Sequence, residues 1–234
     1  MQIKDFAKIF FVILILHLAV LDVGESEMLI RFTKPLLLFS LIAFYMHHTS
    51  QRQNFESTFL AGLFFSLAGD VFLMLEQKGE IYFMLGLGAF LVAQIFYTIS
   101  FLIENKHAKG LVQRQLWLLL PFLAYGFWFV QHLQNNLGEL LAPVAVYASM
   151  LVAMAASALN RNGKVATKSF WLVFAGALFF VASDSFLAIA KFVGPFPKSG
   201  IVVMATYGIA QFLLVWGMLY QRLHPNTDQH QKRS

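Results

Sequence analysis

Two aspartates stand inside long hydrophobic runs, and they constrain the fold of this chain more than any other feature of its sequence. Asp70 lies in the stretch FFSLAGDVFLML at residues 64–75, and Asp184 lies in LFFVASDSFLAI at residues 178–189. A charged side chain within a membrane costs a few kcal/mol or more. An ionisable residue that is kept in such a position is therefore a candidate functional residue.

The composition indicates an integral membrane protein. Hydrophobic residues make up 59% of the 234 residues and charged residues only 12%, whereas a soluble domain has roughly 25% charged residues. The formal net charge is +5, but the basic residues are scattered among short loops, so we expect no nucleic-acid binding. The absence of cysteine excludes disulfides, thiolate metal sites and cysteine nucleophiles.

Eight segments approach the roughly 20 apolar residues that a membrane-spanning helix needs. They cover residues 6–23, 32–48, 57–75, 80–103, 115–132, 139–159, 168–191 and 199–220. We therefore expect an all-α integral membrane protein with eight transmembrane helices in a single domain over residues 1–222. The polar residues 223–234 are expected to form a disordered cytoplasmic tail. No convincing cleavage site follows the first segment, so we expect it to be retained as a span.

The distribution of lysine and arginine predicts the orientation. Twelve of the 17 basic residues fall at the termini and in the second, fourth and sixth loops, which favours both termini in the cytoplasm. The five on the opposite side are Arg31, Lys34, Lys78, Lys191 and Lys198. In a bacterial host, this would place the protein in the inner membrane with its aspartates toward the periplasm.

The two aspartate segments suggest an internal duplication. Residues 63–75 and 177–189 align with five identities, which include Asp70 with Asp184. Four spans per half would run in the same sense, so the halves would form two parallel four-helix repeats related by an axis along the membrane normal. Chance similarity between two phenylalanine-rich helices is the alternative.

The predicted site lies in the non-cytoplasmic half of the membrane, where a helical rise of about 1.5 Å per residue places most of the buried polar groups. Two nearby carboxylates cannot easily both ionise, so a pair shares a proton and offers one acid and one base. We expect Asp70 and Asp184 to be this catalytic pair. The residues expected to bind substrate are Lys34, Gln94, Tyr147, Tyr207 and Gln211.

Each of these residues also has a purely structural interpretation. The aspartates and glutamines could join neighbouring helices, Lys34 could extend its ammonium group to the membrane surface, and the tyrosines could be interfacial. His17 is alone in the first span and is expected to be a hydrogen-bonded core histidine. The histidines lack metal-ligand spacing, so we expect no metal site.

Several short motifs, taken together in their order and spacing, resemble the YhhN, or lysoplasmalogenase, family. They are Thr33-Lys34-Pro35-Leu36, Ala68-Gly69-Asp70, residues 90–97, Tyr147 followed by Met154, Ser183-Asp184, and residues 207–211. The resemblance implies an eight-span enzyme that hydrolyses the vinyl ether bond of a lysoplasmalogen, a lysophospholipid of the bilayer. The products would be a fatty aldehyde and glycerophosphoethanolamine or glycerophosphocholine.

The same resemblance implies that Asp70 and Asp184 form the catalytic pair. It also implies a histidine where this chain has Gln94. A neutral amide can still donate a hydrogen bond to a carboxylate, but it cannot titrate.

Vinyl ether hydrolysis suits a pair of carboxylates, because it begins with protonation of an alkene carbon, a step that general acid catalysis accelerates about 10²–10⁴-fold. The reaction requires no metal, nucleotide or redox cofactor. The alternative is a proton- or cation-coupled transporter that uses the paired aspartates, although no pair of predicted helices is broken in mid-membrane. An intramembrane aspartyl protease fits less well, because residues 67–70 read Leu-Ala-Gly-Asp instead of Gly-x-Gly-Asp.

Overall fold

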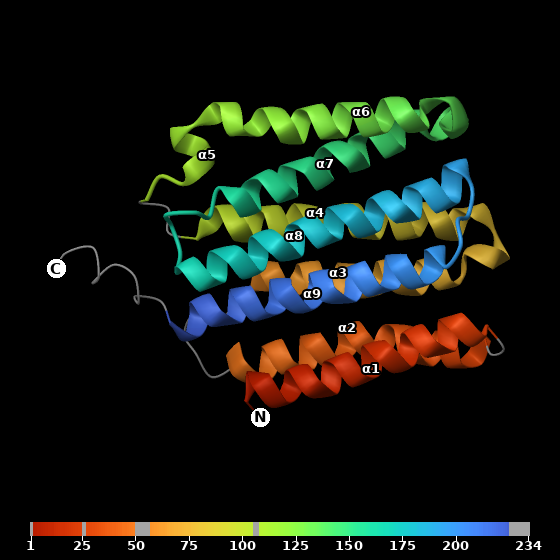
Figure 1. Ribbon diagram of the computed structural model, residues 1–234, viewed down its shortest axis with the longest axis horizontal. Coiled ribbons are helices and arrows are strands. Elements are labelled where there is room, and N and C mark those ends of the chain that lie inside the picture. The colour runs from red at the N-terminus through yellow and green to blue at the C-terminus, as the bar shows by residue number, and fades with distance from the viewer. Residues whose placement is uncertain (1, 25–26, 50–56, 105–107, 225–234) are drawn as a thin grey trace.

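The computed structural model describes residues 2–24, 27–49, 57–104 and 108–224, and within these ranges its regular structure is entirely helical (Figure 1). The long helices are α1 (Ile3–Val23), α2 (Glu27–Thr49), α3 (Ser57–Met74), α4 (Glu80–Ile103), α6 (Leu120–Leu137), α7 (Leu141–Leu159), α8 (Thr167–Ala188) and α9 (Ser199–Leu223). The short elements are η1 (Glu76–Lys78), α5 (Leu111–Arg114), η2 (Leu116–Leu119), η3 (Gly138–Leu140) and the π-helical turn η4 (Ile189–Val193). Each predicted span overlaps one long helix, whereas residues 225–234 of the predicted tail lie outside the described residues.

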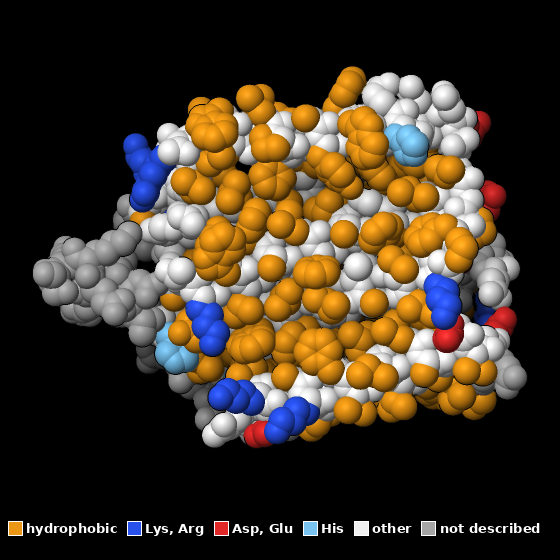
Figure 2. Space-filling view, in the orientation of Figure 1, with side chains coloured by type: hydrophobic (Ala, Val, Ile, Leu, Met, Phe, Trp, Pro, Cys, Tyr) orange, Lys and Arg blue, Asp and Glu red, His pale blue; other side chains and the backbone are white. Residues whose placement is uncertain are grey.

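Seven helical segments in the described ranges are long and apolar enough to cross a membrane. One of them, Leu116–Leu159, contains both α6 and α7. Large apolar side chains such as Ile15, Phe127 and Trp171 are more than half exposed, which suits lipid rather than water. Hydrophobic side chains also cover the middle of the face in Figure 2, with most charged side chains toward its two ends. These features indicate an integral membrane protein.

The helices lie side by side, and the start of α1 and the end of α9 share one end of the bundle (Figure 1). We call this end the termini side and the opposite end the far side. The hairpins α3–α4 and α8–α9 occupy the middle, with α1 and α2 along one edge and α6 and α7 along the other (Figure 1). The central hairpins carry both aspartates, so Asp70 and Asp184 lie inside the bundle.

Glycines bring the helices of the two central hairpins close together. A Cβ on Gly62 of α3 would lie 2.5 Å from the ring of Tyr97 on α4. A Cβ on Gly176 of α8 would lie 3.0 Å from Leu214 on α9. Small residues at such contacts are usual in membrane bundles, because they let the backbones approach.

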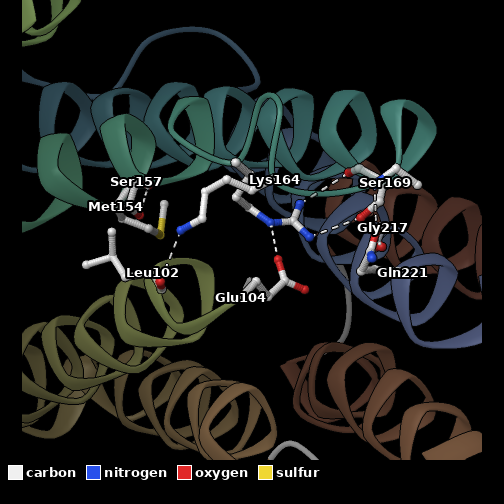
Figure 3. A network of polar contacts seen from close by, with 10 residues as sticks. Leu102, Glu104, Met154, Ser157, Lys164, Ser169, Gly217 and Gln221 are labelled. Carbon is white, nitrogen blue, oxygen red and sulfur yellow. Dashed lines mark hydrogen bonds and ion pairs between the residues drawn. The ribbon is translucent and has the colours of Figure 1, made fainter. Parts of the chain in front are cut away.

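A buried ion pair fixes the termini side of the bundle (Figure 3). Nε of Arg161, in the α7–α8 connection, donates a 2.6 Å hydrogen bond to Glu104 at the end of α4, and the Arg161 side chain is fully buried. Arg161 also donates to the Ser169 hydroxyl on α8 at 3.0 Å, and Ser169 donates to the Gly217 carbonyl on α9 at 2.7 Å. A buried charge must keep its partners, so this network fixes how α4, α8 and α9 meet.

Candidate active site

Asp70 is buried in α3 among groups from α2 and α9. Its side chain is 2% exposed, and its Oδ2 accepts a 2.9 Å hydrogen bond from the Tyr207 hydroxyl. Its Oδ1 lies 3.5 Å from Nζ of Lys34. Lys34 therefore forms an ion pair with an aspartate instead of extending to the membrane surface. Both carboxylate oxygens of Asp70 have a donor, which suits an ionised group.

Asp184 lies in α8 and accepts two hydrogen bonds at the same oxygen. The Tyr147 hydroxyl on α7 donates to Oδ2 at 2.5 Å, and Nε2 of Gln94 on α4 donates to it at 3.2 Å. No ion pair in the described part of the chain involves Asp184. Since neither donor contacts Oδ1, this second oxygen can hold a proton or meet a ligand.

Among the described residues, Gln211 forms no hydrogen bond with either aspartate. Its Oε1 accepts a 3.0 Å hydrogen bond from the Tyr97 hydroxyl, which also lies 3.1 Å from the Ser66 hydroxyl. These three residues join α3, α4 and α9. The structure therefore brings together Lys34, Asp70 and Tyr207 as one cluster and Gln94, Tyr147 and Asp184 as a second, while Gln211 belongs to an interhelical bridge.

A cavity of about 490 Å³ lies on the far side, between α1, α2, η1 and α9. We call it the polar cavity. Its polar and charged lining residues are His17, Glu27, Arg31, Lys34, Glu76, Gln77 and Ser199. Through Lys34 this cavity adjoins the Asp70 cluster.

A second, narrower pocket of about 50 Å³ lies between α4, α6, α7 and α8. We call it the apolar pocket, because most of its lining is Phe, Leu, Val and Ala. Its polar lining residues are Tyr125, Tyr147, Asp184, Ser185 and Lys191. The π-helical turn η4, which directly follows the Asp184 helix, supplies Lys191 and Phe192 to this lining.

Two leucines separate the polar cavity from the apolar pocket. Leu73 and Leu187 line both of them. Each leucine follows an aspartate by three residues, so it lies about one helical turn from Asp70 or Asp184. Both aspartates are therefore adjacent to the place where the two spaces adjoin.

His17 lines the polar cavity, a position that the sequence did not predict. Its imidazole is fully buried in α1, and Nδ1 is hydrogen-bonded to the Thr33 hydroxyl at 2.7 Å, as expected of a core histidine. Its Nε2, however, has no hydrogen-bond partner in the described part of the chain, and the residue lines the polar cavity. No group of three or more metal-binding side chains occurs among the described residues.

The model of the YhhN family matches residues 29–218, which is most of the chain. The chain belongs to the YhhN family. The resemblance predicted from the short motifs is thus confirmed. All seven predicted site residues fall inside the region that matches the YhhN family, whereas His17 precedes it.

Several curated proteins resemble this YhhN family member. Lysoplasmalogenase TMEM86A of Bos taurus is 31% identical over 184 residues, which cover 77% of this chain and 71% of that protein. Lysoplasmalogenase TMEM86B of Homo sapiens is 34% identical over 146 residues, which cover 62% and 58%. A lysoplasmalogenase of Mycobacterium tuberculosis is 29% identical over 148 residues, which cover 62% and 54%. No solved structure shows a significant match.

Proposed function

We propose that this protein hydrolyses the vinyl ether bond of a lysophospholipid and releases a fatty aldehyde and a glycerophospho-base. The observation that carries the proposal is the position of Asp70 and Asp184, adjacent to the boundary between a polar cavity and an apolar pocket. A lipid with its head group in one space and its chain in the other would present the intervening bond to both carboxylates. The relatives named lysoplasmalogenase support this substrate class.

The two spaces match the two ends of such a lipid. Arg31 and Lys34 give the polar cavity cations that suit a phosphate. Aromatic and aliphatic side chains such as Phe83, Phe129 and Leu151 suit an acyl chain. The apolar pocket holds only about 50 Å³ in this conformation, so its side chains move apart when a long chain enters.

Asp184 acts as the acid in the first step. It borders the apolar pocket, where the alkene of the substrate would lie. Asp184 transfers its proton to the alkene carbon remote from the ether oxygen, which leaves an oxocarbenium ion next to that oxygen. The Tyr147 and Gln94 donors stabilise the aspartate anion that this transfer creates.

Asp70 acts as the base in the second step, since its ion pair with Lys34 keeps it ionised. It takes a proton from a water molecule, whose oxygen bonds to the oxocarbenium carbon to give a hemiacetal. Asp70 then returns this proton to the departing glycerol oxygen while Asp184 takes the hemiacetal hydroxyl proton. The carbon–oxygen bond breaks, the aldehyde forms, and both carboxyl groups regain their starting states.

We also propose eight membrane crossings with both termini in the cytoplasm, and a bacterial inner-membrane location if the host is a bacterium. A continuous helix over the 44 residues of Leu116–Leu159 would be about 66 Å long, far more than the roughly 30 Å hydrocarbon core. The separation of this segment into α6 and α7, which lie side by side in Figure 1, supports two crossings. We further propose two parallel four-helix repeats, which Gly62 and Gly176 support because each directly precedes one of the aligned segments 63–75 and 177–189 and makes a close helix contact.

Aldehyde release by the purified protein from a vinyl ether lysophospholipid tests the function. We expect turnover in the wild type, and losses of at least about 100-fold in Asp70→Asn and Asp184→Asn, because each removes one partner of the acid–base pair. Asp5→Asn is the matched control, since Asp5 is exposed in the first turn of α1 and should leave activity unchanged. Near-normal activity in both site variants would contradict the mechanism.

The transporter alternative predicts a different result in the same preparations. Asp70 and Asp184 would then carry protons or cations, and the reconstituted wild type would show proton-coupled flux in vesicles without aldehyde release. Such a result would replace the hydrolase proposal.

A further inference from the structure

The hydrogen bonds around His17 determine which of its ring nitrogens carries the proton. The Thr33 hydroxyl has one proton, which it donates to the Leu29 carbonyl at 2.8 Å. Thr33 can therefore only accept from Nδ1 of His17, which lies 2.7 Å away. In the neutral imidazole, Nδ1 holds the proton and Nε2 is left as an acceptor.

This acceptor has no donor in the described part of the protein. His17 is fully buried, its Nε2 has no hydrogen-bond partner, and the residue lines the polar cavity together with Lys34. A buried acceptor without a partner is unfavourable. A ligand in the polar cavity that supplies a hydrogen-bond donor would therefore gain affinity from this position.

The proposed substrate has a suitable donor close to its reacting bond. Its ether and phosphate oxygens only accept hydrogen bonds, and its amine, where it can donate, lies beyond the phosphate. The free sn-2 hydroxyl is the donor nearest the vinyl ether, since its carbon adjoins the sn-1 carbon that bears the ether oxygen. Lys34 lines the same cavity as His17 and contacts Asp70, so a glycerol bound here lies beside the proposed base.

We propose that Nε2 of His17 accepts a hydrogen bond from the sn-2 hydroxyl of the lysophospholipid, so that His17 selects single-chain over two-chain ether lipids. This inference rests on the proposed function for the position of the glycerol. A second acyl group at sn-2 would remove the donor, leave Nε2 unpaired and bring an apolar chain toward Arg31 and Glu27. A site built around a substrate hydroxyl rejects an analogue that lacks it.

The inference is tested with two lipids that cannot react. The first is an sn-1 alkyl ether lysophospholipid, which has no alkene to protonate, and the second is its 2-deoxy analogue. We expect the purified wild type to bind the hydroxyl form about tenfold more tightly, and His17→Phe to bind both forms equally. His132→Phe is the matched control, because His132 is exposed on α6 and its replacement should keep the preference.

His17→Phe leaves the Thr33 bond to Leu29 in place, and His17→Gln supplies a second variant whose amide oxygen can still accept. We expect His17→Gln to keep part of the preference for the hydroxyl form. A preference that persists in full in His17→Phe would overturn the inference. A wild type that binds both lipids equally would overturn it without any variant.

The binding experiment is independent of turnover. A wild type that prefers the hydroxyl form but releases no aldehyde from the vinyl ether lipid would contradict the proposed function and support the His17 contact. A wild type that releases aldehyde without distinguishing the 2-deoxy form would support the function and exclude the contact.

Discussion

At the scale of single residues, the two aspartates differ in their surroundings although each accepts a hydrogen bond from a tyrosine. Tyr207 donates to Asp70 and Tyr147 donates to Asp184. Asp70 also has the ammonium group of Lys34, whereas Asp184 has only a neutral amide as its second partner. In the proposed mechanism, this asymmetry allows Asp70 to start as a base and Asp184 as an acid.

Replacement of Tyr147 by phenylalanine should slow the reaction without unfolding the protein. The change removes the 2.5 Å donor to Asp184 and so destabilises the anion formed in the first step. We expect Tyr147→Phe to reduce the rate of aldehyde release by about tenfold or more. The rate is measured at saturating lipid, with the melting temperature recorded in parallel.

Tyr125→Phe is the matched control. Tyr125 lines the same apolar pocket, but its hydroxyl is hydrogen-bonded to Ser185 at 2.6 Å and not to Asp184. We expect it to keep a rate close to that of the wild type. Equal losses in the two variants would show that pocket shape, and not the bond to Asp184, controls the rate.

The sequence predicted the depth of these residues but not their partners. The rise of a helix is fixed, so counting from the span ends placed the aspartates and tyrosines in one half of the membrane. The rotation of each helix depends on packing, which is why the sequence did not predict that Gln211 accepts a hydrogen bond from Tyr97. The sequence could not predict that Nε2 of His17 lacks a hydrogen-bond partner among the described residues. This follows from how α2, η1 and α9 are placed around the polar cavity, which the spacing of residues does not reveal.

At the scale of elements, the α3–α4 hairpin sets the position of Asp70 through its neighbour Gly69. A Cβ on Gly69 would lie 2.6 Å from the ring of Phe90 on α4. Phe90 lines the apolar pocket and packs edge-on against Tyr207, with ring centroids 5.8 Å apart. The absence of a side chain at residue 69 therefore lets Phe90 contact the site from the α4 side.

Replacement of Gly69 by alanine should destabilise the protein and disturb the site together. The added methyl group must displace a ring held between α3 and α9, which costs about 1–3 kcal/mol in an overpacked core. We expect Gly69→Ala to lower both the melting temperature and the rate of aldehyde release. Thermal unfolding in detergent and the aldehyde assay measure the two effects.

Gly88→Ala is the control for a glycine-to-alanine change within a helix where the added methyl group has no close neighbour. A Cβ on Gly88, which lies in α4 two residues before Phe90, would meet nothing within 4 Å. Alanine is the better helix former, so this variant should be at least as stable as the wild type. A Gly69→Ala protein with unchanged stability would show that the Phe90 ring moves aside without cost.

The elements that join the helices at the termini side were predicted only in part. Counting charges for orientation treated Arg161 as a loop residue near the membrane surface. The structure does place Arg161 in the α7–α8 connection, but it buries the side chain against Glu104 and Ser169. A partner distant in sequence makes this burial possible, and such a partner is visible only when α4, α8 and α9 are placed together.

At the scale of the whole molecule, the two ends of the bundle carry different features. The termini side holds the Glu104–Arg161 network, which ties the central hairpins together. The far side holds the polar cavity, and both aspartates lie in helices that end on that side. In the proposed orientation, the lipid head group would therefore enter from the non-cytoplasmic surface.

Single cysteines can test this orientation and the number of crossings, because the chain contains no cysteine of its own. Glu139 in η3 and Lys198 before α9 are exposed on the far side, and Lys8 is exposed on the termini side. With eight crossings, a membrane-impermeant maleimide should label Glu139→Cys and Lys198→Cys in intact cells, but Lys8→Cys only after permeabilisation. A single crossing by Leu116–Leu159 would instead bury residue 139 in lipid, and with six crossings before it residue 198 would lie on the cytoplasmic side with Lys8, so neither cysteine would react in intact cells. Labelling at both positions would require the chain to turn back at η3, which is the arrangement that places Tyr147 of α7 against Asp184.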